Sequence, residues 1–157
     1  SKCQNYLVRS IIRRLLEQTQ DKVNTNISDW KLVAGELSDE DWKGLQFAWK
    51  VCSCLKSNAI AVTSESQSLG LGMGQVNRVD AVEQAFGRAE KFHVDQTTKY
   101  LASDAFFPFP DSIELAAKFG AKAIVQQGGS IKDEDVIAKA KELNIPMLFT
   151  GARHFRH

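Results

Sequence analysis

The chain has 157 residues and a mass of 17.5 kDa, with 43% hydrophobic and 25% charged residues. This length and composition are typical of one globular domain and exclude a disordered, collagen-like or coiled-coil protein. Twenty Lys and Arg against 19 Asp and Glu leave a formal charge of +1, so bulk charge predicts no nucleic-acid partner. No apolar run reaches the ~20 residues of a membrane span, and we expect a cytoplasmic protein without a membrane partner.

The three cysteines, Cys3, Cys52 and Cys54, do not form a disulfide framework. An odd number cannot all pair within one chain, and Cys52 and Cys54 are too close in the sequence for a useful cross-link. We therefore expect three reduced thiols, as in a cytosolic protein. Because no Cys and His residues have the spacing of a tetrahedral site, we predict that the fold contains no zinc.

Helices and strands alternate along most of the chain. The opening segment, residues 6–16, is compatible with either a helix or strands. After it, the N-cap Ser38 and an apolar stripe predict a helix over 39–55. The elements expected next are a strand at 58–62, a turn at 63–68, a helix around 79–89, a strand at 101–104, a helix at 111–119, a strand at 123–126, a helix beginning near Asp133 and a strand at 146–149. This alternation from residue 39 onward predicts an α/β layered fold.

Two glycine-rich stretches could bind an anion. Gly70, Gly72 and Gly74 precede a predicted helix, where backbone N–H groups can approach a negative charge. Their spacing is not that of a Rossmann motif. Residues 128–130, Gly-Gly-Ser, lie between a strand and a helix, at the end of the sheet where ligands gather in α/β folds. In both stretches the alternative is that glycine simply forms a tight turn.

Two further stretches could recognise a ligand. Residues 103–111 hold three Phe and two Pro, so rigidly held rings could form a wall for a flat ligand, and Asp111 could accept hydrogen bonds from an amine. The alternative is an aromatic core plug with Asp111 as helix N-cap. Residues 151–157 hold two Arg and two His directly after a buried strand, and Arg153 could clamp a phosphate. The alternative there is a solvated basic tail.

Six strings, in this order, resemble one family. They are Trp49-Lys50-Val51, Lys56-Ser57-Asn58-Ala59-Ile60, Gly72-Met73-Gly74-Gln75-Val76-Asn77-Arg78, Ser103-Asp104-Ala105-Phe106-Phe107-Pro108-Phe109, Gln127-Gly128-Gly129-Ser130, and Thr150-Gly151-Ala152-Arg153-His154-Phe155-Arg156-His157. The family is the bifunctional purine-biosynthesis enzyme that joins AICAR transformylase to inosine monophosphate cyclohydrolase. The chain resembles the C-terminal part of the transformylase half, strongly over 37–157 and weakly over 1–36. The expected unit is therefore one C-terminal subdomain over 1–157, as a fragment, an excised domain or a truncated relative.

The resemblance implies a fold similar to cytidine deaminase, a layered mixed sheet with helices but without zinc, and it favours strands at Leu7–Ile12 and Leu15–Gln18. It implies transfer of a formyl group from 10-formyltetrahydrofolate, the folate co-substrate, to AICAR on the path to IMP. By resemblance, Arg153 binds the ribose phosphate of AICAR, Phe106 packs beside its imidazole carboxamide, and Asp111 holds the pterin edge. Asn58 lies at the reacting centre, hydrogen-bonded to a catalytic His, and Arg78 contacts the folate or the partner's site wall.

The sequence also departs from the family pattern. The family's catalytic Lys-His pair lies in an earlier segment, and no Lys-His dipeptide occurs here, so we expect this chain alone to be inactive. Leu55 and Ala59 stand where members of the family have hydroxyl side chains that help to bind a potassium ion, and Lys56 adds a positive charge. These residues therefore do not favour a bound potassium ion. The family's sites lie between two copies, which implies a homodimer. The alternative function is a non-catalytic α/β module that binds a phosphorylated metabolite.

Overall fold

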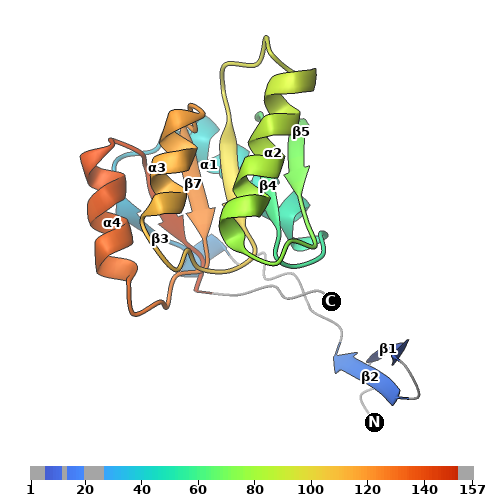
Figure 1. Cartoon of the computed structure of the whole chain (residues 1–157). Coiled ribbons are helices and arrows are strands. Elements are labelled where there is room, and N and C mark those ends of the chain that lie inside the picture. The colour runs from blue at the N-terminus through green and yellow to red at the C-terminus, as the bar shows by residue number, and fades with distance from the viewer. Residues whose placement is uncertain (1–5, 12–13, 20–26, 152–157) are drawn as a thin grey trace.

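The structure, a computed structural model, describes residues 6–11, 14–19 and 27–151. Within them lie a six-stranded sheet, in the order β3-β8-β7-β6-β4-β5, and a separate two-stranded hairpin, β1-β2 (Figure 1). The strands of the sheet are β3 (Lys31–Ala34), β4 (Ile60–Thr63), β5 (Ser68–Gly72), β6 (Tyr100–Ser103), β7 (Ala123–Gln126) and β8 (Met147–Phe149). The helices are the short 3-10 helix η1 (Ile27–Asp29), α1 (Asp39–Ser53), α2 (Arg78–Phe92), α3 (Asp111–Lys118) and α4 (Asp133–Glu142).

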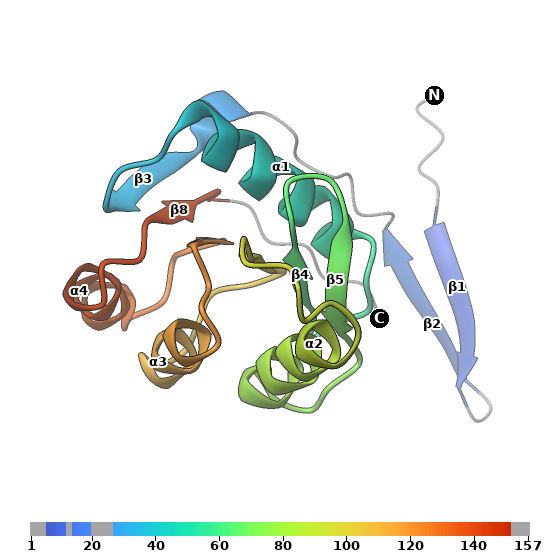
Figure 2. The same cartoon turned by 90° about the horizontal axis from the view of Figure 1, so that it is seen from above.

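The sheet is mixed and has helices on both faces. Strands β6, β7 and β8 are parallel, whereas β4 runs antiparallel to β6 and β5, and β3 runs antiparallel to β8. Helix α1 covers one face, and α2, α3 and α4 cover the other (Figure 2). Along β4, Ile60 and Val62 join the core under α2 to α4, while Ala61 joins the core under α1. This alternation follows from the two-residue period of a strand, and the predicted layered α/β fold is confirmed.

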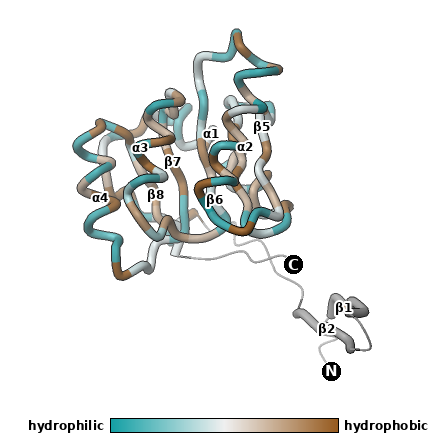
Figure 3. The backbone as a smooth tube through the Cα atoms, viewed as in Figure 1, coloured by the Kyte–Doolittle hydropathy of each residue, from teal (hydrophilic) through white to brown (hydrophobic). Residues whose placement is uncertain are grey.

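Most predicted elements are confirmed. The four helices begin within about a residue of the expected positions, and Ser38 is the N-cap of α1 in a capping box with Asp41. The opening segment forms the antiparallel strands β1 (Tyr6–Ile11) and β2 (Arg14–Thr19), as the resemblance implied. Strand β3 was not predicted, and β5 lies where a glycine loop was expected. Figure 3 shows hydrophobic and hydrophilic positions mixed along α2, α3 and α4, as expected for helices with one buried face.

Gly70 and Gly72 form neither an anion-binding loop nor a turn, so both alternatives for these two positions were wrong. They lie in β5, directly beneath α2. A Cβ atom at Gly70 would be 1.8 Å from the carbonyl oxygen of Ala85, and one at Gly72 would be 2.0 Å from that of Ala81. The glycines thus allow the helix backbone to lie directly on the edge strand. Only Gly74, with φ of 66°, lies in the following loop and has the turn conformation that glycine favours.

The close approach of α2 to β5 predicts opposite effects for two Gly→Ala substitutions. Gly70→Ala is expected to destabilise the chain by about 1–3 kcal/mol or more, because α2 must move away from β5. Gly87→Ala is the matched control within α2, since a Cβ added there would meet no neighbouring group within 4 Å. It should stabilise the helix by roughly 0.5–1 kcal/mol. Urea unfolding of both variants checks this, and equal effects at the two positions would contradict the packing argument.

A buried carboxylate, Asp41, ties α1 to the amino ends of β6 and β7. Its Oδ1 accepts a hydrogen bond from the hydroxyl of Tyr100 at 2.8 Å and forms an ion pair with Nζ of Lys122 at 2.7 Å. Its Oδ2 accepts from the backbone N–H of Ser38 at 3.1 Å. Burial by itself raises the pKa of Asp41, but the hydrogen bonds from Lys122, Tyr100 and Ser38 outweigh it and lower the pKa from 3.8 to about 2.

This lowered pKa makes the stability of the chain depend on pH. The unfolded chain takes up the proton of Asp41 at a higher pH than the folded chain, so the contribution is complete above about pH 4 and is lost as the pH falls through 2. Asp41→Asn should therefore cost about 1–2 kcal/mol at pH 7 and flatten the stability curve between pH 4 and 2. The measurement is urea unfolding across this range, with the exposed Asp39→Asn as control. An Asp41→Asn curve parallel to that of the wild type would contradict the assignment.

None of the described helices is long and apolar enough to cross a membrane. Cys52 and Cys54 form no disulfide, as predicted, while Cys3 lies outside the described residues. Cys52 is fully buried in the core under α1, and its Sγ donates to the carbonyl of Ala59 at 3.5 Å. Burial, and after it the nearby Asp104 carboxylate, raises the pKa of this thiol. A thiol held neutral in this way is a core residue and not a nucleophile.

Candidate functional site

The carboxyl ends of β6, β7 and β8 meet the amino end of β4 at one edge of the sheet. The backbone N–H of Asp104, just after β6, donates to the carbonyl of Ala59, just before β4, at 3.2 Å. The backbone N–H of Thr150, just after β8, donates to the carbonyl of Gln126 at 2.9 Å. Helices α2, α3 and α4 also begin at this edge (Figure 1). Segments far apart in the sequence are thus brought together where ligands of α/β folds gather.

A buried polar cluster lies at this edge, between α2, β4 and β6. Arg78, the first residue of α2, is 8% exposed, and Asp104 is 1% exposed. The Nη1 of Arg78 forms an ion pair with Oδ1 of Asp104 and donates to the carbonyl of Ala59 at 3.3 Å. Its Nη2 donates to Oδ1 of Asn58 at 3.0 Å. Because Arg78 and Asp104 are buried together, each compensates a charge that would be costly alone.

Asn58 has a fixed orientation within this cluster. Its Nδ2 donates to the carbonyls of Gln75 and Val76, each at 3.1 Å, and its Oδ1 accepts from Arg78. Carbonyls only accept and guanidinium groups only donate, so the amide cannot be reversed. The peptide bond between Ser57 and Asn58 is cis. An amide at neutral pH moves no proton, so Asn58 can orient a reacting group through Oδ1 but cannot act as general acid or base.

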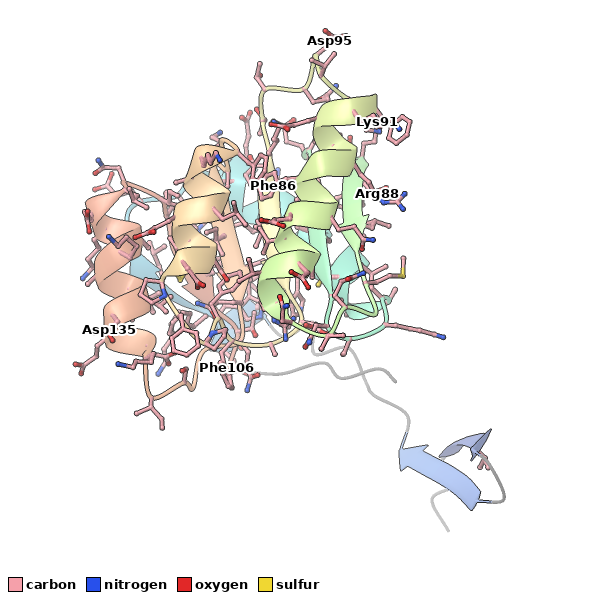
Figure 4. All side chains as sticks on the ribbon, viewed as in Figure 1. Phe86, Arg88, Lys91, Asp95, Phe106 and Asp135 are labelled. Carbon is pink, nitrogen blue, oxygen red and sulfur yellow. The ribbon has the colours of Figure 1, made fainter. Side chains whose placement is uncertain are left out.

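Phe106 and Asp111 lie at the same edge, on the segment that joins β6 to α3. Phe106 is half-buried, and Figure 4 shows it at the end of the molecule opposite Asp95. The backbone N–H of its neighbour Phe107 donates to the buried Oε1 of Gln126 at 2.7 Å, which fixes the segment. Asp111 is exposed, and its Oδ1 accepts from the N–H of Ser112 at 2.8 Å. The alternative that Asp111 is the N-cap was wrong, since Pro110 holds that position without a side-chain cap.

The glycine turn at residues 128–130 already binds a carboxylate of the protein itself, that of Asp133. Gly128 and Gly129 have φ values of 75° and 91°, so the predicted turn is confirmed. The carboxylate of Asp133 accepts from the N–H of Gly129 at 2.6 Å and from that of Ser130 at 3.0 Å. These are the backbone groups that a bound anion would need. The protein's own side chain thus occupies this position, and an external phosphate would have to displace it.

The described residues offer a poor metal site. Within 6–11, 14–19 and 27–151 no group of three or more His, Cys, Asp and Glu side chains could hold a metal ion. Asp104 has one carboxylate oxygen paired with Arg78, and its Oδ2 has no hydrogen-bond partner there. Leu55 and Ala59 carry no side-chain oxygen, and the carbonyl of Ala59 already accepts from Arg78 and Asp104.

The structure brings together four of the five predicted site residues at one edge, Asn58, Arg78, Phe106 and Asp111. Arg153 lies outside the described residues, two positions after Gly151. The sequence did not predict the pairing of Asp104 with Arg78. Nor did it predict that the side-chain oxygen of Gln84 would accept hydrogen bonds from Met73 and Gln75 in the loop after β5. The string Ser103 to Phe109 contained Asp104, but nothing in the pattern indicated a partner 26 positions away.

Comparison with known proteins places the chain in a family. A model of the family described as AICARFT/IMPCHase bienzyme matches residues 1–88. A bifunctional purine biosynthesis protein PurH from Streptococcus pyogenes is 48% identical over 94% of this chain and 28% of its own length. The PurH protein of Desulfitobacterium hafniense is 48% identical over 96% of this chain and 29% of its own length. The PurH protein of Persephonella marina is 46% identical over 88% of this chain and 27% of its own length.

The chain therefore spans less than a third of the length of these relatives. Among solved structures, dCMP deaminase from the cyanophage S-TIM5 in its apo form is similar, with a TM-score of 0.46 and 14% sequence identity over 71% of this chain and 98% of that chain. The family match covers more than half of the 157 residues, and the identities to PurH proteins extend over nearly all of them. The chain belongs to the AICARFT/IMPCHase bienzyme family.

Proposed function

We propose that this chain is the C-terminal part of the transformylase half of the bienzyme. There it forms part of a site that transfers a formyl group from 10-formyltetrahydrofolate to AICAR in purine biosynthesis. The observation that carries the proposal is the convergence of Asn58, Arg78, Phe106 and Asp111 on one edge of the sheet. Positions spread over more than fifty residues are expected to share an edge if they serve one ligand site.

The contacts support distinct roles for these residues. Asn58 presents a fixed amide oxygen that can orient the reacting amine or a catalytic His. Phe106, half-buried beside the fixed Phe107, provides a ring face for the imidazole carboxamide. The exposed Asp111 offers carboxylate oxygen to the amine edge of a pterin. Arg78 points inward to Asn58 and Asp104, so we assign it to positioning Asn58 more than to direct folate contact.

Formyl transfer to a weakly nucleophilic amine also needs proton transfer, which neither Asn58 nor Asp104 provides. Asn58 cannot move a proton, and the Asp104 carboxylate is paired with Arg78. We therefore propose that the remaining polypeptide supplies the general acid–base pair and that a second copy completes the site in a cytoplasmic homodimer. Orientation by Asn58 then acts by holding the reactants in a productive geometry.

The alternative is a non-catalytic module that binds a phosphorylated metabolite. The missing Lys-His dipeptide favours it for this chain taken alone. However, Asp133 occupies the amides of the loop at 128–130, and Gly70 and Gly72 lie beneath α2. The N–H groups of Gly129 and Ser130 are therefore already occupied, and the formyltransferase proposal is the better supported of the two.

The proposal predicts that two variants of the full-length enzyme each weaken the binding of one substrate. Arg153→Ala is expected to weaken AICAR binding by ~1.5–3 kcal/mol, as for the loss of a hydrogen bond to a charged group. Asp111→Asn should weaken binding of the folate by a similar ~1.5–3 kcal/mol and leave AICAR binding unchanged. Calorimetric titration with each substrate measures both effects. Asp95→Asn, at the opposite end of the molecule, is the control (Figure 4). Unchanged affinities in both variants would refute the proposed site.

A further inference from the structure

The loop at 73–77, between β5 and α2, is held from two sides. On the inner side, Nδ2 of Asn58 donates to the carbonyls of Gln75 and Val76. On the outer side, Gln84 in the second turn of α2 extends its side chain back to the loop. Its Oε1 accepts from the backbone N–H of Met73 at 3.1 Å and from Nε2 of Gln75 at 3.2 Å. Nε2 of Gln75 also donates to the carbonyl of Met73 at 3.2 Å.

The donor and acceptor roles in this network admit one arrangement. The backbone N–H of Met73 can only donate, so the Gln84 atom that faces it is the oxygen. The backbone carbonyl of Met73 can only accept, so the Gln75 atom that faces it is the nitrogen, which then donates to Gln84 as well. Each amide is thus oriented by a backbone group, and the network does not depend on a chosen side-chain flip.

The network continues into the candidate site. Gln84 fixes the side chain of Gln75, and the backbone carbonyl of Gln75 accepts from Asn58. Asn58 in turn accepts from Arg78, whose guanidinium is paired with Asp104. Beyond the loop, Asn77 caps α2 by accepting from the N–H of Asp80 at 2.8 Å, which fixes the start of the helix that carries Arg78. A hydrogen-bonded path therefore runs from Gln84, on the outer side of the loop, to Asn58.

We infer that Gln84 is a positioning residue that fixes the Asn58 amide through Gln75 and the loop at 73–77. The expected fall in kcat rests on the proposed function, whereas the expected displacement of Asn58 does not. Without the Gln84 oxygen, the N–H of Met73 and the side chain of Gln75 lose their shared acceptor. The loop carbonyls that hold both hydrogens of Asn58 Nδ2 are then no longer fixed from the outer side. Only an oxygen acceptor is needed at position 84, because the donors come from the loop.

The test compares Gln84→Met, Gln84→Glu and the control Glu83→Met in the full-length enzyme. Methionine keeps the bulk of Gln84 but removes the oxygen, glutamate keeps an oxygen acceptor, and Glu83 is an exposed neighbour on α2. In crystal structures, Gln84→Met should displace the loop so that Asn58 loses at least one of its two contacts to the carbonyls of Gln75 and Val76. Its kcat for formyl transfer should fall about 3- to 30-fold, as for a slightly misplaced reacting group, with KM for AICAR within about twofold. Gln84→Glu and Glu83→Met should match the wild type.

The outcomes separate the two claims. Unchanged Asn58 contacts in Gln84→Met overturn the inference whatever the kinetics. A Gln84→Glu variant as slow as Gln84→Met also overturns it, because glutamate keeps the oxygen acceptor. A displaced Asn58 with unchanged kcat would confirm that Gln84 fixes the amide and would contradict the catalytic role proposed for Asn58. A wild-type enzyme that transfers no formyl group would instead refute the proposed function, and the crystal structures would still decide whether Gln84 positions Asn58.

Discussion

Arg78→Met is expected to destabilise the chain by about 3–5 kcal/mol, the cost of removing one partner of a buried ion pair. Asp104 is 1% exposed, and its Oδ2 has no hydrogen-bond partner among the described residues, so Arg78 is the charge that compensates it. The substitution leaves a buried carboxylate without its cation and also removes the donors to Asn58 and Ala59. Urea unfolding followed by the fluorescence of the buried Trp49 measures the change.

Two further variants show whether the charge is the cause. Arg88→Met replaces an exposed arginine of the same helix and should change stability by less than about 0.5 kcal/mol, as surface substitutions usually do. Asp104→Asn removes the buried negative charge, so it should recover part of the loss when combined with Arg78→Met. The coupling energy of this double-mutant cycle should be at least about 1 kcal/mol. Additive effects would mean that the two side chains do not stabilise each other.

The isolated 157-residue chain should fold but should transfer formyl groups at least ~10²–10⁴-fold more slowly than the full-length enzyme, because general acid–base groups typically contribute that factor. Folding is expected because the sheet is covered by helices on both faces and has a core on each side. Inactivity is expected because Asn58 orients but moves no proton, and the Asp104 carboxylate is held by Arg78.

A spectroscopic assay of tetrahydrofolate release, with equal concentrations of sites, compares the two proteins. Circular dichroism of the isolated chain first establishes that it is folded, so that inactivity is not the result of unfolding. Turnover per site similar to that of the full-length enzyme would contradict the prediction. It would mean that a residue of this chain, such as His154 or His157, acts as the base.

The local elements could be predicted because their signals lie within a few neighbouring residues. The N-cap Ser38, the apolar stripe of α1 and the acidic first turn of α4 each identify a helix on their own. The strand β5 could not be recognised, because glycine is normally a turn residue and Gly70 and Gly72 are explained only by the helix that lies on them. Similarly, nothing near Asp133 in the sequence showed that its carboxylate would fill the glycine loop before it.

For the candidate site too, the sequence was enough to identify residues but not the contacts between them. The residues of the resembling strings, among them Asn58 and Phe106, could be identified from the sequence, because residue type and order along the chain are enough for that. Which of them touch was decided by the tertiary structure. The ion pair of Arg78 with Asp104, and the path from Gln84 to Asn58, join residues from different elements. Such contacts depend on strand order and helix placement, which arise only when the sheet assembles and buries the charged groups together.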